Sequence, residues 1–85
     1  MKRFEYIVRD ENGIHARPAG LLVKQAKAYE CGISIAKGGE SADARKLFAL
    51  MSLCVKQGDT VTVSCDGTDE EKAAQELERF FKENL

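Results

Sequence analysis

Apolar residues in this 85-residue chain switch repeatedly between two spacings, and this switching constrains the fold more than any other feature. Phe4, Tyr6 and Val8 alternate with charged residues, a pattern typical of a strand with one buried face. From Ala16 the spacing becomes that of an amphipathic helix, whose apolar face is predicted to hold Ala19, Leu22, Val23, Ala26 and Tyr29. Gly32 is predicted to stop this helix.

The middle of the chain repeats the two spacings over shorter lengths. Ile33 and Ile35 predict a second strand, and Gly38-Gly39 predicts a tight hairpin leading to a third strand near residues 40–43. A short second helix is expected over residues 45–53. Its apolar stripe is predicted to comprise Leu47, Leu50, Met51 and Cys54, with Phe48 off the stripe.

The last third of the chain predicts one more strand and one more helix. Val61, Val63 and Cys65 alternate with hydroxyl side chains and predict the fourth strand. Thr68 and Glu71 have the spacing of a capping box, which predicts the start of the last helix. The apolar face of that helix is predicted to comprise Ala74, Leu77, Phe80 and Phe81.

The resulting order, βαββαβα, predicts a fold of the α+β class. We expect a two-layer open-faced sandwich, in which a four-stranded, mostly antiparallel sheet carries three helices on one face. The other face is left to solvent, which suits Arg3, Glu5, Thr60 and Thr62 at the alternate strand positions. Residues 1–85 are predicted to form a single domain.

Composition excludes several classes of function. No apolar run is long enough to span a membrane and the N-terminus lacks the pattern of a signal peptide, so a cytoplasmic protein without membrane insertion is expected. Cys31, Cys54 and Cys65 are odd in number and widely spaced, which favours free thiols over disulfides or a metal site. No cofactor is expected, and a chain this short should carry its chemistry at the surface.

Charge is distributed unevenly along the chain. Residues 14–57 hold seven basic and three acidic side chains, a charge of +4, whereas residues 58–85 hold three basic and eight acidic, a charge of −5. A basic middle favours anions or acidic protein partners, although an ordinary solvated surface would show the same bias. Nucleic-acid binding is disfavoured because the net charge is −1 and no aromatic residues interleave with the basic ones.

The stretch NGIHARPAG contains the only histidine and the only proline of the chain. If His15 caps the first helix, then Ala16, Arg17 and Pro18 form its first turn, where proline is tolerated. No acidic side chain is available there for the unpaired amides, so an anion such as phosphate would complete the helix end. A neutral His15 would then accept the phosphoryl group. The residues alone leave open that His15 is an ordinary cap or surface residue.

The segments GIHARPAG, KLFALMSL and KQGDTVTVSCDGTDEEKA together resemble the HPr family, the histidine-containing phosphocarriers of the bacterial phosphoenolpyruvate-dependent sugar phosphotransferase system. The resemblance implies a carrier, not an enzyme, whose His15 accepts a phosphoryl group on Nδ1 from enzyme I and donates it to enzyme IIA proteins. It also implies that Arg17 and the amides of Ala16 and Arg17 bind the phosphoryl group and that Pro18 opens the helix.

The same resemblance implies a docking surface around the site. Its apolar part, called here the apolar patch, consists of Leu47, Phe48 and Met51. Lys24 and Lys27 are expected beside it, together with Arg17, Arg45 and Lys46, where they would attract acidic partners. The chain is expected to act as a monomer.

Two residues depart from the family pattern. Lys46 stands where many HPr proteins carry a regulatory serine, so phosphorylation by the corresponding kinase is not expected at this position. Cys54 stands where glycine is usual, at a cost of about 1 kcal/mol if the residue adopts a left-handed conformation. A regulatory module that docks partners without passing phosphate on remains the alternative, although the presence of both His15 and Arg17 argues against it.

Overall fold

The computed structural model describes residues 1–85 and contains four strands and three helices in the predicted order. Their bounds are β1 (Lys2–Ile7), α1 (Ala16–Ala26), β2 (Gly32–Lys37), β3 (Glu40–Asp43), α2 (Leu47–Ser52), β4 (Thr60–Asp66) and α3 (Glu70–Asn84). All four predicted strands are therefore confirmed, including the short third strand after the Gly38-Gly39 turn.

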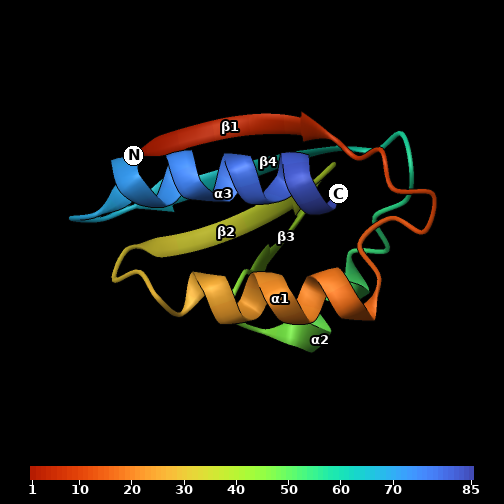
Figure 1. Cartoon of the computed structure of the whole chain (residues 1–85), viewed down its shortest axis with the longest axis horizontal. Helices are drawn as coiled ribbons and strands as arrows, with labels where there is room; N and C mark the ends of the chain where they lie inside the picture. The colour runs from red at the N-terminus through yellow and green to blue at the C-terminus, as the bar shows by residue number, and fades with distance from the viewer.

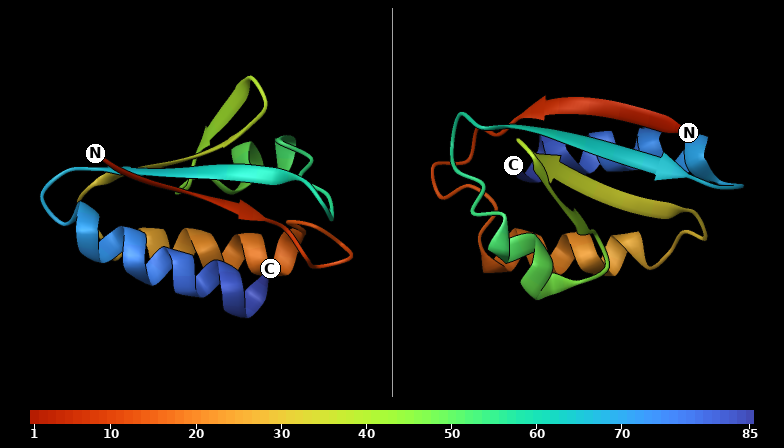
Figure 2. Two further views of the ribbon diagram at one scale, coloured as in Figure 1. Left: turned by 90° about the horizontal axis from the view of Figure 1, so that it is seen from above. Right: turned by 180° about the vertical axis from the view of Figure 1, so that it is seen from behind.

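The four strands form one antiparallel sheet in the order β1-β4-β2-β3. Val63 of the central strand β4 pairs with Phe4 on one side and Ile35 on the other, which aligns the apolar positions of three strands. Figures 1 and 2 show α1 and α3 side by side across one face of this sheet, with α2 next to α1 at the β3 edge. The predicted open-faced sandwich of the α+β class is confirmed.

One hydrophobic core lies between the sheet and the helices. The alternate strand residues Tyr6, Ile35 and Val63 are buried there, whereas Arg3 and Glu5 are exposed on the opposite face as predicted. Phe81 of α3 packs edge-on against Phe4, Tyr6 and Phe80, with ring centroids 5.5–6.1 Å apart. These ring contacts fix α3 against β1.

The end of α1 differs from the prediction. The helix stops at Ala26, and Gly32 begins β2 instead of ending the helix. The amides of Ala28 and Tyr29 donate to carbonyls three residues back, which tightens and closes the last turn. Tyr29 is nevertheless buried, as predicted, and its hydroxyl donates to the Glu76 carboxylate of α3.

The predicted stripe of α2 is only partly correct. Leu50 is buried and Leu47 half-buried, but Met51 and Cys54 are exposed and Leu53 fills the core position. The helix is only six residues long, so the chain leaves it before the predicted spacing can continue to Cys54.

The start of α3 does not use the predicted capping box of Thr68 and Glu71. Asp69 is the N-cap residue, and Glu70 accepts a hydrogen bond from the Gly67 amide at 3.1 Å. The Asp69 carboxylate instead accepts the amides of Glu30 and Cys31, both at 2.9 Å, and so ties α3 to the start of β2. Further along, Ala73 is the fully buried alanine, whereas Ala74 is only half-buried.

Cys54 has a left-handed backbone conformation, with φ of 51°, and is the only residue other than glycine to have one. The Lys37 ammonium group donates to the Cys54 carbonyl at 2.9 Å and contacts the Asp59 carboxylate at 3.1 Å. Cys54 therefore adopts the left-handed conformation that makes a residue other than glycine costly at this position. A lysine from β2 holds the strained segment in place.

Replacing Cys54 with glycine should raise the free energy of unfolding by about 1 kcal/mol, because glycine adopts this φ without steric cost. Chemical denaturation measures the difference. Cys54→Ser is the matched control, since serine keeps the Cβ atom and should give no comparable gain. An equal gain in both variants would show that the thiol, and not the backbone, limits stability.

The stability supplied by Asp69 should depend on pH. The hydrogen bond from the Glu30 amide, followed by that from Cys31, lowers the pKa of Asp69 in the folded state. This carboxylate therefore stabilises the fold above the usual aspartate range, and the stabilisation is lost as pH falls through the lowered pKa. Unfolding curves of the protein and of Asp69→Asn should differ at neutral pH and converge in acid. Glu78→Gln, on the same helix, should show no such convergence.

Candidate functional site

His15 is the N-cap residue of α1, as predicted. Its backbone is extended, with φ of −93° and ψ of −177°, and its carbonyl accepts the Ala19 amide at 3.0 Å. The imidazole makes no capping hydrogen bond, and the first turn contains no acidic residue. The amides of Ala16 and Arg17 have no acceptor within the protein.

Pro18 occupies the position in the first turn where the sequence predicted it. Its ring is buried, and its lack of an amide hydrogen costs nothing here because no intrahelical bond is required at this position. Two amides and the positive end of an eleven-residue helix therefore lie beside His15. Arg17 is exposed on the same turn, so its guanidinium group is free to reach an anion there.

A close main-chain contact positions the segment that leads into His15. Gly13 has φ of +65°, and a Cβ atom at this residue would lie 2.0 Å from the Val55 carbonyl oxygen. The next amide, that of Ile14, donates to the same oxygen at 3.2 Å. The turn before α1 is therefore fixed against the segment that follows α2.

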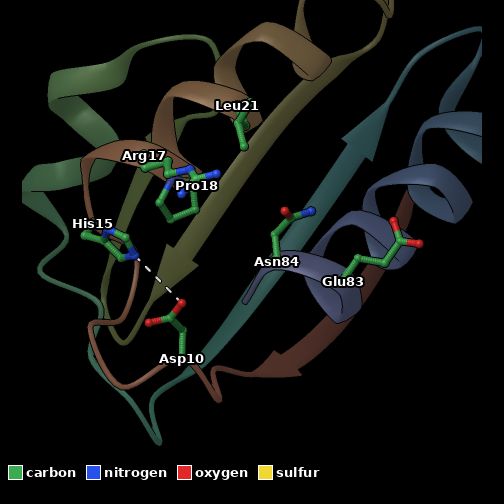
Figure 3. A pocket seen from close by; sticks show the side chains of 7 residues that line it. All are labelled: Asp10, His15, Arg17, Pro18, Leu21, Glu83 and Asn84. Atoms are coloured by element: carbon green, nitrogen blue, oxygen red, sulfur yellow. Dashed lines mark ion pairs between the residues drawn. The ribbon is translucent and has the colours of Figure 1, made fainter.

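A pocket opens beside His15 where the start of α1 meets the end of α3 (Figure 3). Its lining consists of Asp10, His15, Arg17, Pro18, Leu21, Glu83 and Asn84. The structure thus brings together His15, Arg17 and Pro18 from the predicted site. It adds two residues of α3, which are almost seventy positions away in sequence and which no local pattern indicated.

Asp10 is the most consequential residue that the sequence analysis missed. Its Oδ2 atom lies 3.7 Å from Nε2 of His15, while its Oδ1 atom accepts the Asn12 amide at 2.8 Å (Figure 3). The turn formed by Asp10 and Asn12 is a local feature that the DENG stretch does indicate. The approach to His15 depends on how the loop closes, and a sequence pattern does not show this.

The apolar patch lies mostly in solvent. Phe48 is 82% exposed and Met51 38% exposed, whereas Leu47 is half-buried against the core. α2 packs beside α1, so the patch lies next to the helix that begins at His15 (Figure 1). Exposure of a phenylalanine to this degree suits a surface that meets a partner.

The predicted basic residues divide into two groups. Lys24 and Lys27 are exposed at the end of α1, and Lys46 is exposed at the start of α2. Arg45 is different, because its guanidinium group donates to the carbonyls of Tyr29 and Cys31 at 2.6 and 2.8 Å. Arg45 therefore holds the α1–β2 connection together and is removed from the predicted docking surface.

The three cysteines form no disulfide, and only Cys54 is exposed. Burial raises the pKa of the Cys31 thiol to about 12 and raises that of Cys65 as well, so both remain protonated at neutral pH. No helix in the chain combines the length and the apolar character that crossing a bilayer requires.

Comparison with known proteins identifies the family. The family model described as "PTS HPr component phosphorylation site" matches residues 2–83. The phosphocarrier protein HPr of Haemophilus influenzae is 47% identical over 66 residues, which cover 78% of each chain. That of Mycoplasma genitalium is 33% identical over 85 residues, covering 99% of this chain and 97% of the relative.

Solved structures give the same result for the fold. The crystal structure of HPr from Thermoanaerobacter tengcongensis has a TM-score of 0.92 at 34% identity, covering 96% of this chain and 92% of that chain. The catabolite repression protein Crh of Bacillus subtilis was crystallised as a domain-swapped dimer. It has a TM-score of 0.79 at 33% identity, covering 100% of this chain and 98% of that chain. Because both the sequence and the fold match over nearly the whole chain, the chain belongs to the HPr family of phosphocarrier proteins of the phosphotransferase system.

Proposed function

We propose that this chain carries a phosphoryl group on His15, receiving it from enzyme I and donating it to enzyme IIA proteins in the cytoplasm. The observation that supports this most strongly is the start of α1, where two amides without acceptors directly follow the only histidine of the chain. Residues 1–85 would act as one carrier domain without a cofactor.

The transfer requires little from the carrier apart from position and charge. The lone pair of Nδ1 of His15 forms a bond to phosphorus while the bond between phosphorus and the donor breaks, and the donor keeps that electron pair. Donation to the next protein reverses these roles. The exposed position of the site allows two large partners to reach it in turn.

The phosphoryl group carries negative charge that the helix start is suited to receive. The amides of Ala16 and Arg17 and the helix dipole are oriented before the group arrives, so no reorganisation is needed at the moment of transfer. Arg17 adds a charge-assisted hydrogen bond. Because these groups also stabilise the charge of the transition state, they speed the transfer in both directions.

The alternative, a regulatory module that docks without carrying phosphate, takes its support from the structural similarity to Crh, whose name links that protein to catabolite repression. The apolar patch would serve either function. Uptake of a phosphoryl group distinguishes the two, since a docking module needs none.

Incubation with enzyme I and phosphoenolpyruvate should add one acid-labile phosphoryl group, and His15→Ala should abolish the addition. Arg17→Ala should slow it about 100-fold, the effect of removing one preorganised donor, and Arg17→Lys should restore part of the rate. Intact-mass measurement over time follows the reaction. Arg79→Ala, which removes an exposed arginine on α3, is the matched control and should be unaffected.

Absence of uptake with an enzyme I that phosphorylates another HPr would favour the docking module. A phosphoryl group retained in His15→Ala would place the carrier site elsewhere in the chain.

Phe48→Ala should weaken binding to enzyme I about tenfold, or roughly 1.4 kcal/mol, because a central aromatic side chain would leave the interface. Thermal stability should change little, since Phe48 is 82% exposed. Isothermal titration measures the dissociation constant. Ile7→Ala, which removes an exposed apolar side chain from the open sheet face, is the control. Equal dissociation constants for Phe48→Ala and the unaltered protein would remove Phe48 from the interface.

A further inference from the structure

Asp10 presents one free carboxylate oxygen to the ring of His15. Its Oδ2 atom lies 3.7 Å from Nε2, and Figure 3 shows the two groups facing each other across the mouth of the pocket. The other oxygen, Oδ1, is held by the Asn12 amide at 2.8 Å. Oδ2 has no other hydrogen-bond donor within the protein.

The main chain around Asp10 is fixed at several points. The Asp10 amide donates to the Leu85 main-chain oxygen at 2.8 Å, and the Asp10 carbonyl accepts the Gly13 amide at 2.9 Å. The neighbouring Arg9 amide also donates to Leu85, at 2.7 Å. The main chain that carries the carboxylate is therefore anchored to Leu85 and to the turn that follows Asp10.

From this geometry we propose that Asp10 is a positioning residue for His15, which keeps the ring proton on Nε2 and leaves the lone pair of Nδ1 free for the phosphoryl group. Only the role of Nδ1 toward the phosphoryl group rests on the proposed function, because the position of the ring proton is a property of the unphosphorylated protein. A contact of 3.7 Å is an ion-pair distance and is longer than a hydrogen bond, so the two groups must approach further for Asp10 to hold the ring proton.

The chemistry of a neutral imidazole supports this assignment. The ring carries one proton, and the nitrogen that faces an acceptor keeps it. Asp10 is the acceptor paired with the ring, on the Nε2 side, whereas the start of α1 supplies donors, namely two amides and the Arg17 guanidinium group. Donors near the ring favour the tautomer in which Nδ1 has a free lone pair and Nε2 carries the proton.

Asp10 would contribute to both directions of transfer. When Nδ1 bonds to phosphorus, the ring becomes positively charged while its proton stays on Nε2, and the adjacent carboxylate offsets that charge. When the bond between Nδ1 and phosphorus breaks, Nδ1 takes back the electron pair and the ring leaves as neutral imidazole. Without the proton on Nε2 the leaving group would be an imidazolate anion, which leaves far less readily.

Two other charged groups line the pocket and must be separated from Asp10 in the test. Arg17 would oppose a positive ring and Glu83 would favour it, but no contact joins either of them to the imidazole. Asp10→Asn is the informative variant. Its amide oxygen can still accept the Asn12 amide, so the turn is kept, while its NH2 group faces Nε2 and favours the proton on Nδ1.

The experiment is nitrogen NMR of the isotope-labelled, unphosphorylated protein, at a pH where histidine side chains are uncharged. We expect the Nε2-protonated tautomer to predominate in the unaltered protein and to lose its majority in Asp10→Asn. Transfer from enzyme I, followed by intact mass, should slow about tenfold in the same variant. Glu11→Gln removes the same charge from the adjoining residue and should change neither measurement.

An unchanged tautomer ratio in Asp10→Asn, with its fold intact by circular dichroism, overturns the inference. An altered ratio with an unchanged transfer rate overturns its catalytic half. Failure of the proposed function is distinct, because the unaltered protein would then take up no phosphoryl group whatever its tautomer ratio.

Discussion

The close approach of Gly13 to the main chain of Val55 is the contact on which the rest of the site depends. Only a residue without a side chain fits there, and the following amide donates to the same carbonyl oxygen. This contact fixes the turn before α1, which in turn fixes where the helix begins and which residue caps it. The contact thus sets the position of His15 and joins the start of α1 to the segment that follows α2, while the buried face of α1 fixes the direction of the helix.

The helix that begins there is left incomplete by its own sequence. A serine or aspartate at the cap would satisfy its early amides and stabilise the helix. His15 provides no such bond, so the amides of Ala16 and Arg17 stay available to a ligand. The stability given up at this point is supplied elsewhere, for example where Asp69 joins α3 to β2 and where Arg45 joins α2 to the end of α1. A phosphocarrier needs its stabilising contacts to lie away from this helix end, because a helix end whose amides are already hydrogen-bonded has no affinity for phosphate.

Sequence reasoning predicted most of the fold because each strand and helix has a short, regular apolar pattern. The strands around Val63 and the helix face of Leu22 are examples, and the Gly38 turn has its own local signal. Several of its errors arose where the outcome depended on a distant contact. The Asp69 carboxylate accepts the amides of Glu30 and Cys31, and the Arg45 guanidinium group donates to main-chain carbonyls, so neither side chain acts as its neighbours in sequence suggest. His15, Arg17 and Pro18 lie in one stretch of sequence, so a local pattern could predict them. Asp10 and Glu83 join them in the pocket only when the chain folds.

The two outer strands of the sheet have a consequence for the behaviour of the protein in a crowded cell. A strand at a sheet edge exposes main-chain groups that a second chain can pair with, and this is a common route to aggregation. Here β3 spans only four residues and has a carboxylate at each end, Glu40 and Asp43, while β1 begins with Lys2 and Arg3. The short length of β3 and the charges on both edge strands disfavour the addition of a further strand, so a protein that must meet several partners in turn can stay dispersed at high concentration.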